Sequence, residues 1–163
     1  MKKILLGILL SGSIAGAFAQ NSCNIKKAYA FYTVSVPGMI MKDDNGNDVR
    51  PAPSVERIIY IECSGTKTPV FEAISYNNIM LKTIVTKTET ASITVGKRPN
   101  TEKDYTLKAG KGNTIWKIVV QQADGNTAVA EGCKNIIIKS RSGTKVCRFN
   151  INKETELMGL PNY

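Results

Sequence analysis

Apolar and polar residues alternate in short runs along most of the chain, from residue 28 to residue 151. In the run 145–151, Cys147, Phe149 and Ile151 lie on one face of an extended chain, and the residues between them lie on the other. The runs are rich in valine, isoleucine, threonine and tyrosine, which favour β-strands. The pattern predicts about nine short strands, at 28–36, 56–63, 69–76, 79–86, 91–95, 104–108, 114–122, 135–140 and 145–151.

Turn signals separate these runs. Asn45-Gly46 and Asp124-Gly125 are dipeptides that tolerate the positive φ angles of tight hairpins, and Ser142-Gly143 lies between two strand-like runs. After residue 19, no stretch of about a dozen residues has the periodicity of a helix. We therefore expect an all-β fold, either an antiparallel β-sandwich of immunoglobulin-like or Greek-key type or a small barrel.

The tetrapeptide SGTK occurs twice, at 64–67 and 142–145, each time after an isoleucine-rich run. A phosphate-binding P-loop needs a further glycine upstream of the Gly-Lys pair, and neither copy has it. The cysteines around the two copies do not correspond, which argues against an internal duplication. We interpret both copies as turns that precede a new strand.

The first nineteen residues have the pattern of a secretory signal peptide. Lys2 and Lys3 precede a short apolar run, and Ala17 and Ala19 are the small residues that a signal peptidase recognises. We expect cleavage after Ala19, a single β domain over 20–163, and a secreted or periplasmic protein with no transmembrane segment after signal removal. Lipidation at Cys23 is the less favoured alternative.

The four cysteines predict two disulfides, because their number is even and the chain is expected to be exported. Cys63 and Cys147 both share a strand face with apolar residues, so we expect a Cys63–Cys147 bridge across the core, near Trp116. A second bridge, Cys23–Cys133, would then hold the N-terminus. Pairing of Cys23 with Cys63 and of Cys133 with Cys147 remains the alternative.

The sequence contains no histidine, which removes the commonest general base and metal ligand. We expect no metal and no cofactor. Glu62 and Glu72 interrupt strands and could face a common cleft, but a solvent-facing position is more usual for such glutamates. The segment 43–48 begins like a calcium loop, yet Asp48 stands where that loop needs glycine, so we interpret it as a hairpin turn.

Positive charge is the clearest indication of function. The chain carries 22 lysines and arginines against 13 acidic residues, a net charge of +9. If the loops near residues 97 and 142 share one end of the fold, Lys97, Arg98, Arg141 and Lys145 form a basic patch. Such a patch would attract an anionic glycan, a lipid headgroup or an acidic protein. Nucleic acid is not expected, because no aromatic residues interleave with the basic loops as stacking platforms.

We therefore expect a non-catalytic binding or structural module of the cell envelope, with the basic loop patch as its ligand site. One alternative is a small enzyme that acts on an acidic polysaccharide through a carboxylate, a tyrosine and a lysine in one cleft. The other is a secreted inhibitor or a subunit of a surface assembly, which would need a protruding loop or an unpaired edge strand.

Overall fold

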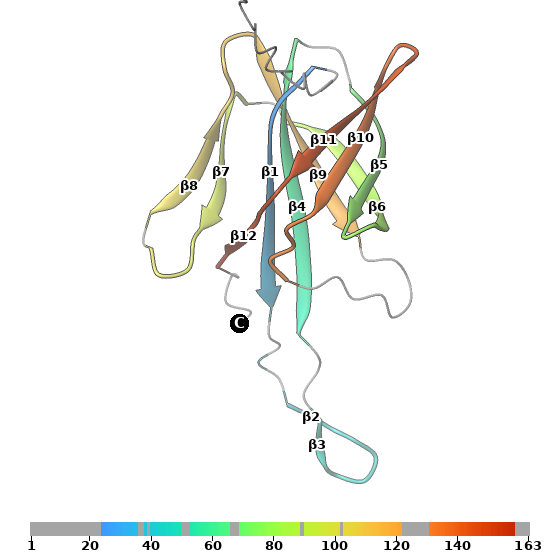
Figure 1. Cartoon of the computed structure of the whole chain (residues 1–163). Coiled ribbons are helices and arrows are strands. Elements are labelled where there is room, and N and C mark those ends of the chain that lie inside the picture. The colour runs from blue at the N-terminus through green and yellow to red at the C-terminus, as the bar shows by residue number, and fades with distance from the viewer. Residues whose placement is uncertain are drawn as a thin grey trace, which may run out of the picture.

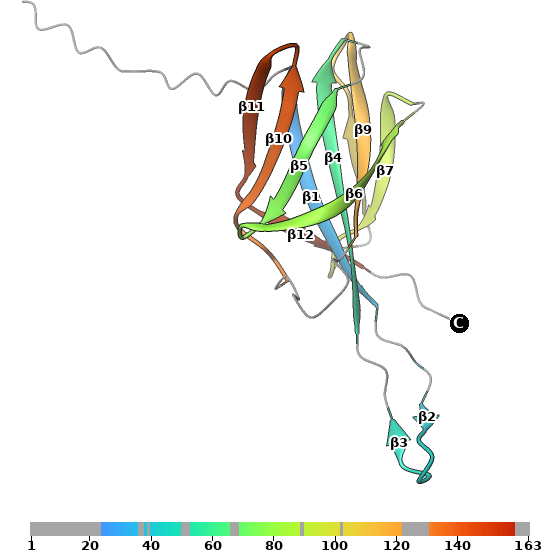
Figure 2. The same ribbon diagram turned by 90° about the vertical axis from the view of Figure 1, so that its right-hand side faces the viewer.

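We analysed a computed structural model of the chain (Figures 1 and 2). It describes residues 24–35, 38, 40–49, 53–65, 69–88, 90–101, 103–121 and 131–158. The described residues form twelve β-strands. They are β1 (Ile25–Ser35), β2 (Met41–Lys42), β3 (Asp48–Val49), β4 (Ser54–Ser64), β5 (Val70–Tyr76), β6 (Ile79–Lys87), β7 (Ser92–Lys97), β8 (Asp104–Lys108), β9 (Asn113–Gln121), β10 (Ile136–Ser142), β11 (Lys145–Ile151) and β12 (Glu154–Leu157).

Eight strands form one curled sheet, in the order β11-β10-β5-β6-β9-β4-β1-β12. Every pairing in it is antiparallel except that of β1 with β12, which is parallel. The two edge strands follow one another in sequence, with only Asn152 and Lys153 between them. This short connection therefore joins the two edges of the curled sheet (Figure 2).

The inner surface of this curled sheet encloses the main hydrophobic core. Every second residue of β4 and β9 points into it, and Ile59, Ile61 and Ile118 have no exposed surface. Trp116 belongs to the same core, as the sequence predicts. At about 25 cal/mol per Å² of apolar surface, burial of these side chains is the main favourable term for folding.

A second core lies on the outer face of the sheet. There Phe31, Tyr60 and Ile115 pack beneath the separate hairpin β7–β8, which contributes Leu107. Because β4 is covered on both faces, Ile59 to Cys63 are all buried, and this explains why apolar residues follow one another without alternation from Ile58 to Ile61.

Glu62 attaches the β7–β8 hairpin to the sheet. Its Oε1 accepts hydrogen bonds from the Gly110 amide at 2.8 Å and from Asn113 Nδ2 at 2.6 Å. Although burial alone would raise the pKa of Glu62, these hydrogen bonds and the Lys27 ammonium, 3.9 Å from Oε2, hold that pKa below its usual value. The charged carboxylate therefore stabilises the turn between β8 and β9.

The nine strands expected from the alternation are all present, with ends that differ by three residues or fewer. The expected number of strands was wrong, because the described part of the chain also contains β2, β3 and β12. The first two are only two residues long and flank the predicted turn at Asn45-Gly46. The third reads Glu-Thr-Glu-Leu and has no apolar alternation to reveal it.

Both predicted disulfides are wrong, because Cys63 and Cys133 are buried free thiols. Cys63 pairs in register with Ile25 on one side and Thr114 on the other, so β1 and β9 flank it. Cys133 lies beside Glu154, which pairs with Ala30. Cys23 itself is outside the described residues.

The hairpin β2–β3 extends away from the curled sheet (Figure 1). Asp43 organises its turn, since its Oδ1 accepts hydrogen bonds from the amides of Asn45 and Asn47 at 3.0 and 2.8 Å. Gly46 supplies the positive φ, 83°. The predicted hairpin turn is confirmed. The second predicted turn, at Asp124-Gly125, lies outside the described residues. No helix in the described ranges has the length and apolar character needed to cross a membrane.

The role of Glu62 predicts a pH-dependent loss of stability in Glu62→Gln. At pH 7 we expect the variant to be less stable by roughly 1–3 kcal/mol, because charge-assisted hydrogen bonds are lost. The folded pKa lies below the unfolded value near 4.5, so the contribution is present above that value and disappears as the pH falls through the folded pKa. Urea unfolding at pH 7 and at pH 3 measures this. The control Glu72→Gln, at a surface ion pair, should change stability by less than about 1 kcal/mol.

The free thiols predict the alkylation pattern. Burial and the nearby Glu62 raise the pKa of Cys63 to about 12, so the native protein should not react with iodoacetamide at this residue near pH 8. In denaturant without reductant, mass spectrometry should find Cys63 and Cys133 both alkylated. A peptide that links Cys63 to Cys147 would contradict the structure.

Candidate ligand pocket along strand β12

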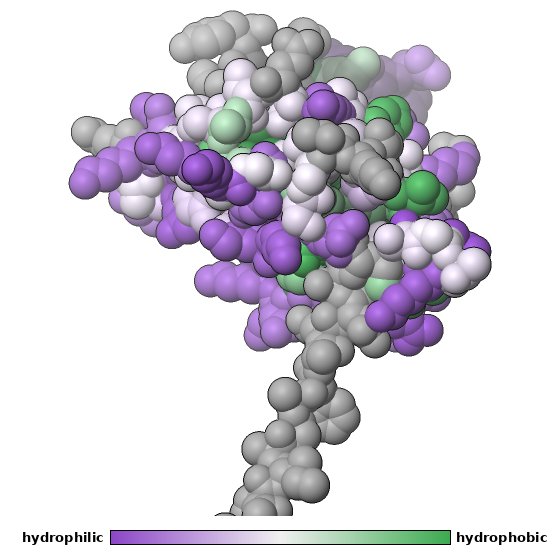
Figure 3. All heavy atoms as spheres, turned by 90° about the horizontal axis from the view of Figure 1, so that it is seen from above, coloured by the Kyte–Doolittle hydropathy of each residue, from purple (hydrophilic) through white to green (hydrophobic). Residues whose placement is uncertain are grey.

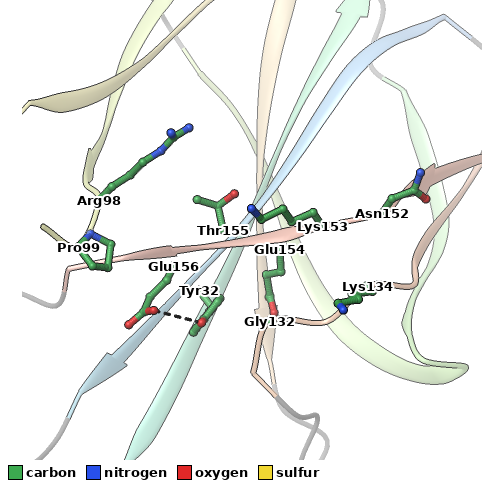
Figure 4. Close-up of a pocket in the computed structure, with 10 residues that line it drawn as sticks. All are labelled: Tyr32, Arg98, Pro99, Gly132, Lys134, Asn152, Lys153, Glu154, Thr155 and Glu156. Carbon is green, nitrogen blue, oxygen red and sulfur yellow. Dashed lines mark hydrogen bonds between the residues drawn. The ribbon is translucent and has the colours of Figure 1, made fainter. Parts of the chain in front are cut away.

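An open pocket of about 820 Å³ follows the edge strand β12 (Figure 4). Five consecutive residues, 152–156, form its base, and the turn after β7 and the segment before β10 form its walls. The residues that line it are Tyr32, Arg98, Pro99, Gly132, Lys134, Asn152, Lys153, Glu154, Thr155 and Glu156.

A buried ion pair holds the base of the pocket in place. Glu154 is one of the lining residues, but its side chain is buried on the inner face of the curled sheet, where its Oε1 lies 3.2 Å from Arg57 Nε. Their side chains are 0% and 2% exposed. Both groups are therefore shielded from the water that would otherwise screen them, so their geometry is strongly constrained.

The same carboxylate also fixes one wall. The Cys133 amide donates to Glu154 Oε2 at 3.2 Å, and the Glu154 amide donates to the Cys133 carbonyl at 3.0 Å. These two hydrogen bonds hold Gly132 and Lys134 beside β12. The pocket therefore depends on a side chain that hardly touches its surface.

Burial dominates the electrostatics of this pair. It raises the pKa of Glu154, against the opposing effect of the Arg57 guanidinium and the hydrogen bonds that the carboxylate accepts. Arg57 also lies over the ring of Tyr76, with 5.6 Å from Cζ to the ring centroid. Burial and the carboxylate of Glu154 raise the pKa of the Tyr76 hydroxyl well above its usual value.

A second carboxylate, Glu156, faces the pocket. It follows Glu154 by two residues, so both point to the same side of β12, but Glu156 lies at the open end and is exposed. The Tyr32 hydroxyl donates to Glu156 Oε2 at 3.3 Å, as Figure 4 shows. Burial and then the charge of Glu156 raise the pKa of Tyr32, so the phenol stays protonated.

Three cations also line the pocket. Arg98, Lys134 and Lys153 are all exposed, and in Figure 4 Lys153 lies between the other two. The guanidinium of Arg98 stacks on the ring of Tyr105, 4.4 Å from its centroid, which restrains the side chain. Glu154 is compensated by Arg57, so positive charge predominates at the pocket surface.

The structure separates the four basic residues that the sequence placed in one patch. Arg98 lines the pocket, and the carbonyl of neighbouring Lys97 accepts a hydrogen bond from the Met158 amide at 2.8 Å. Arg141 and Lys145 lie at the far end of the β10–β11 hairpin, about 20 Å from its Ile136–Ile151 end, which adjoins the pocket.

The two loops therefore lie at opposite ends of the molecule (Figure 1). The single basic patch was expected only if both loops shared one end of the fold. Arg141 forms an ion pair with Glu72. Figure 3 views the end that is uppermost in Figure 1, and most of its described surface is hydrophilic, with only separate hydrophobic spots.

The other chemical expectations can be placed as well. Glu62 and Glu72 do not share a cleft. Glu62 accepts hydrogen bonds from the turn between β8 and β9, whereas Glu72 forms an ion pair with Arg141. Within the described ranges, no cluster of three or more histidine, cysteine or acidic side chains has a geometry suited to a metal ion.

Sequence reasoning missed most of the pocket. Lys134, Lys153 and Glu156 lie in polar segments that resemble ordinary surface loops, and Tyr32 is one aromatic residue in a strand rich in them. The one signal was the lack of apolar alternation in 152–156, which marked the segment as something other than a core strand.

Comparison of the chain with protein-family models, with curated proteins and with solved structures found no match. The pocket must therefore be interpreted from its own chemistry. Three cations and a phenol can bind oxygen anions by charge and by hydrogen bonds, and the open shape admits part of a larger molecule.

Substitution of the two carboxylates of β12 should reduce stability to very different extents. Glu154→Gln should destabilise the protein by about 3–5 kcal/mol, because it leaves the buried Arg57 without its counter-charge. Glu156→Gln is the matched control on the same strand face and should cost less than about 1 kcal/mol. Chemical denaturation of both variants at pH 7 compares them. Equal effects would mean that the buried pair does not hold β12.

Proposed function

We propose that the protein is an exported, non-catalytic binding module of the cell envelope, and that the pocket along β12 binds an acidic glycan. The observation that carries the proposal is that Arg98, Lys134 and Lys153 all line the pocket, whereas Glu156 is the one exposed carboxylate among its lining residues. The signal-like segment 1–19 supports export.

The shape of the pocket favours a chain-like ligand. Its base is an extended strand, and its walls leave it open to solvent, so a polymer can lie along it without being enclosed. Carboxylate or sulfate groups spaced along a glycan could meet the three cations in turn, while the Tyr32 hydroxyl and the Asn152 side chain offer hydrogen bonds to sugar hydroxyls.

The proposal predicts salt-sensitive binding that depends on the pocket lysines. Titration calorimetry against heparin, alginate and polygalacturonate should show saturable binding to at least one of them, weakening as salt increases. The variant Lys134→Ala/Lys153→Ala should bind about tenfold more weakly, because two charge-assisted contacts are lost.

The matched control is Lys108→Ala/Lys111→Ala, which removes the same charge from the exposed end of β8 and the turn after it, outside the pocket. Its affinity should change by less than about threefold. Equal loss in the two variants would mean that net charge, not the pocket, attracts the glycan. If the protein binds phosphatidylglycerol vesicles but none of the glycans, the ligand of the pocket is a lipid headgroup and not a glycan.

An enzyme on an acidic polysaccharide is the second candidate, because the pocket brings a tyrosine, a carboxylate and lysines together. The raised pKa of Tyr32 argues against it, since a tyrosine that acts as a base needs a pKa lowered toward neutrality. Each glycan mixture should therefore stay intact on size analysis after long incubation. If the protein cleaves a glycan and the Tyr32→Phe variant does not, the protein is an enzyme and the binding-module proposal is wrong.

A further inference from the structure

The curled sheet has an opening on the side away from the pocket, between β5 and β6. These strands pair only at their joined ends, from Tyr76 opposite Ile79 to Ile74 opposite Leu81. Beyond Leu81, β6 continues along β9 as far as Lys87, while β5 turns away to run along β10 (Figure 2). In the described part of the chain, no strand pairs with the outer side of β6 after Leu81.

The direction of the backbone groups on this edge follows from one hydrogen bond. The Thr88 amide donates to the Ile115 carbonyl at 3.1 Å, in the same register that joins β6 to β9. In an antiparallel ladder, alternate residues bond to the same neighbour. Thr86 and Ile84 therefore bond to β9, and the amides and carbonyls of Thr83, Val85 and Lys87 point outward.

The side chains make this edge unusual. Ile84 and Val85 are 51% and 38% exposed and lie on opposite faces of the strand. An edge with free backbone groups and exposed apolar side chains is a template for another strand. Lys82 and Lys87 stand at the two ends of the stretch, and residues 79–88 contain no acidic residue.

The two lysines discriminate between possible partner strands. If a second copy paired antiparallel over all of Lys82–Lys87, each Lys82 would face a Lys87, and like charges directly opposite destabilise a sheet. A strand with acidic residues at both ends and apolar residues between them would meet opposite charge at both ends and apolar side chains in the middle.

We propose that Lys82–Lys87 is a strand-accepting edge that binds an extended segment of a partner protein, apolar in its centre and acidic at its ends. Backbone hydrogen bonds to Thr83, Val85 and Lys87 provide affinity, and the lysines select the partner. This surface is separate from the pocket along β12, so its function does not depend on the glycan proposal.

The probe is the synthetic peptide Glu-Thr-Val-Val-Thr-Glu with blocked ends, and its control is Lys-Thr-Val-Val-Thr-Lys. Fluorescence anisotropy at low salt should give an affinity for the acidic peptide at least about tenfold higher than for the basic one. In the amide NMR spectrum, Thr83, Val85 and Lys87 should gain protection from hydrogen exchange when the acidic peptide binds. Equal affinity for the two peptides would overturn the proposed selection by charge.

The decisive variant is Val85→Pro. It removes one outward amide but no bond to β9, and proline is tolerated on an edge strand where its missing amide faces solvent. Binding of the acidic peptide should fall by about tenfold or more, with the fold retained by circular dichroism. Val85→Thr is the matched control, because it changes the side chain but keeps the amide, and it should retain binding within about threefold.

Three results would overturn the proposal. The first is undiminished peptide binding by a folded Val85→Pro variant. If that variant does not fold, Val85 methylated at its backbone nitrogen by semisynthesis repeats the test. The second is protection of the outward amides in the peptide-free monomer, which would show that the chain covers its own edge. The third is a dimer in sedimentation that Val85→Pro dissociates, which would make a second copy the partner.

Discussion

The buried ion pair between Arg57 and Glu154 is the constraint on which the rest of the structure depends. It joins a central strand, β4, to the edge strand β12 across β1, which lies between them in the sheet. Removing both charges from water is costly, and the opposite charge of Arg57 and the hydrogen bond from the Cys133 amide offset only part of this cost for Glu154, whose pKa remains raised. The segment Glu-Thr-Glu-Leu has little apolar surface to hold it on the sheet. The ion pair therefore explains why a polar segment becomes a strand parallel to β1, and why Lys153 and Glu156 line the pocket.

A second consequence concerns strand β4, which is buried on both faces. The inner face belongs to the main core, and the outer face lies under the β7–β8 hairpin. That hairpin is attached at one end by Glu62, which holds the turn after β8, and at the other by the hydrogen bond between Met158 and Lys97. The second attachment brings Arg98 to β12. The positive charge of the pocket thus comes from three separate segments: the turn after β7, the segment before β10 and the residues before β12. Packing in the two cores keeps these segments together.

Much of the fold could be predicted from the sequence, because the burial of apolar side chains imposes a period of two on strands. Cys147, Phe149 and Ile151 face inward as that period requires. The site could not be predicted in the same way. Glu154 is buried because of Arg57, nearly a hundred residues away, and no local pattern records such a contact. The disulfides could not be predicted for a related reason: a cysteine on an apolar strand face can be a buried free thiol as well as half of a bridge, and Cys63 is a buried free thiol. The two basic loops lie at opposite ends of the fold because of strand direction, which the alternation does not reveal.

Both surfaces with a proposed role occur where the pairing of the sheet stops. The pocket follows β12, which has no further neighbour in the sheet, and the strand-accepting edge begins where β5 leaves β6. Proteins commonly place lysines on such edges to prevent uncontrolled strand pairing. Lys134 and Lys153 occupy that position near β12, and Lys82 and Lys87 occupy it on β6. Charges that repel a second copy of the same chain attract an acidic ligand by the same Coulomb interaction. The two proposed roles therefore rest on lysines at two separate edges of the sheet and not on one continuous basic surface.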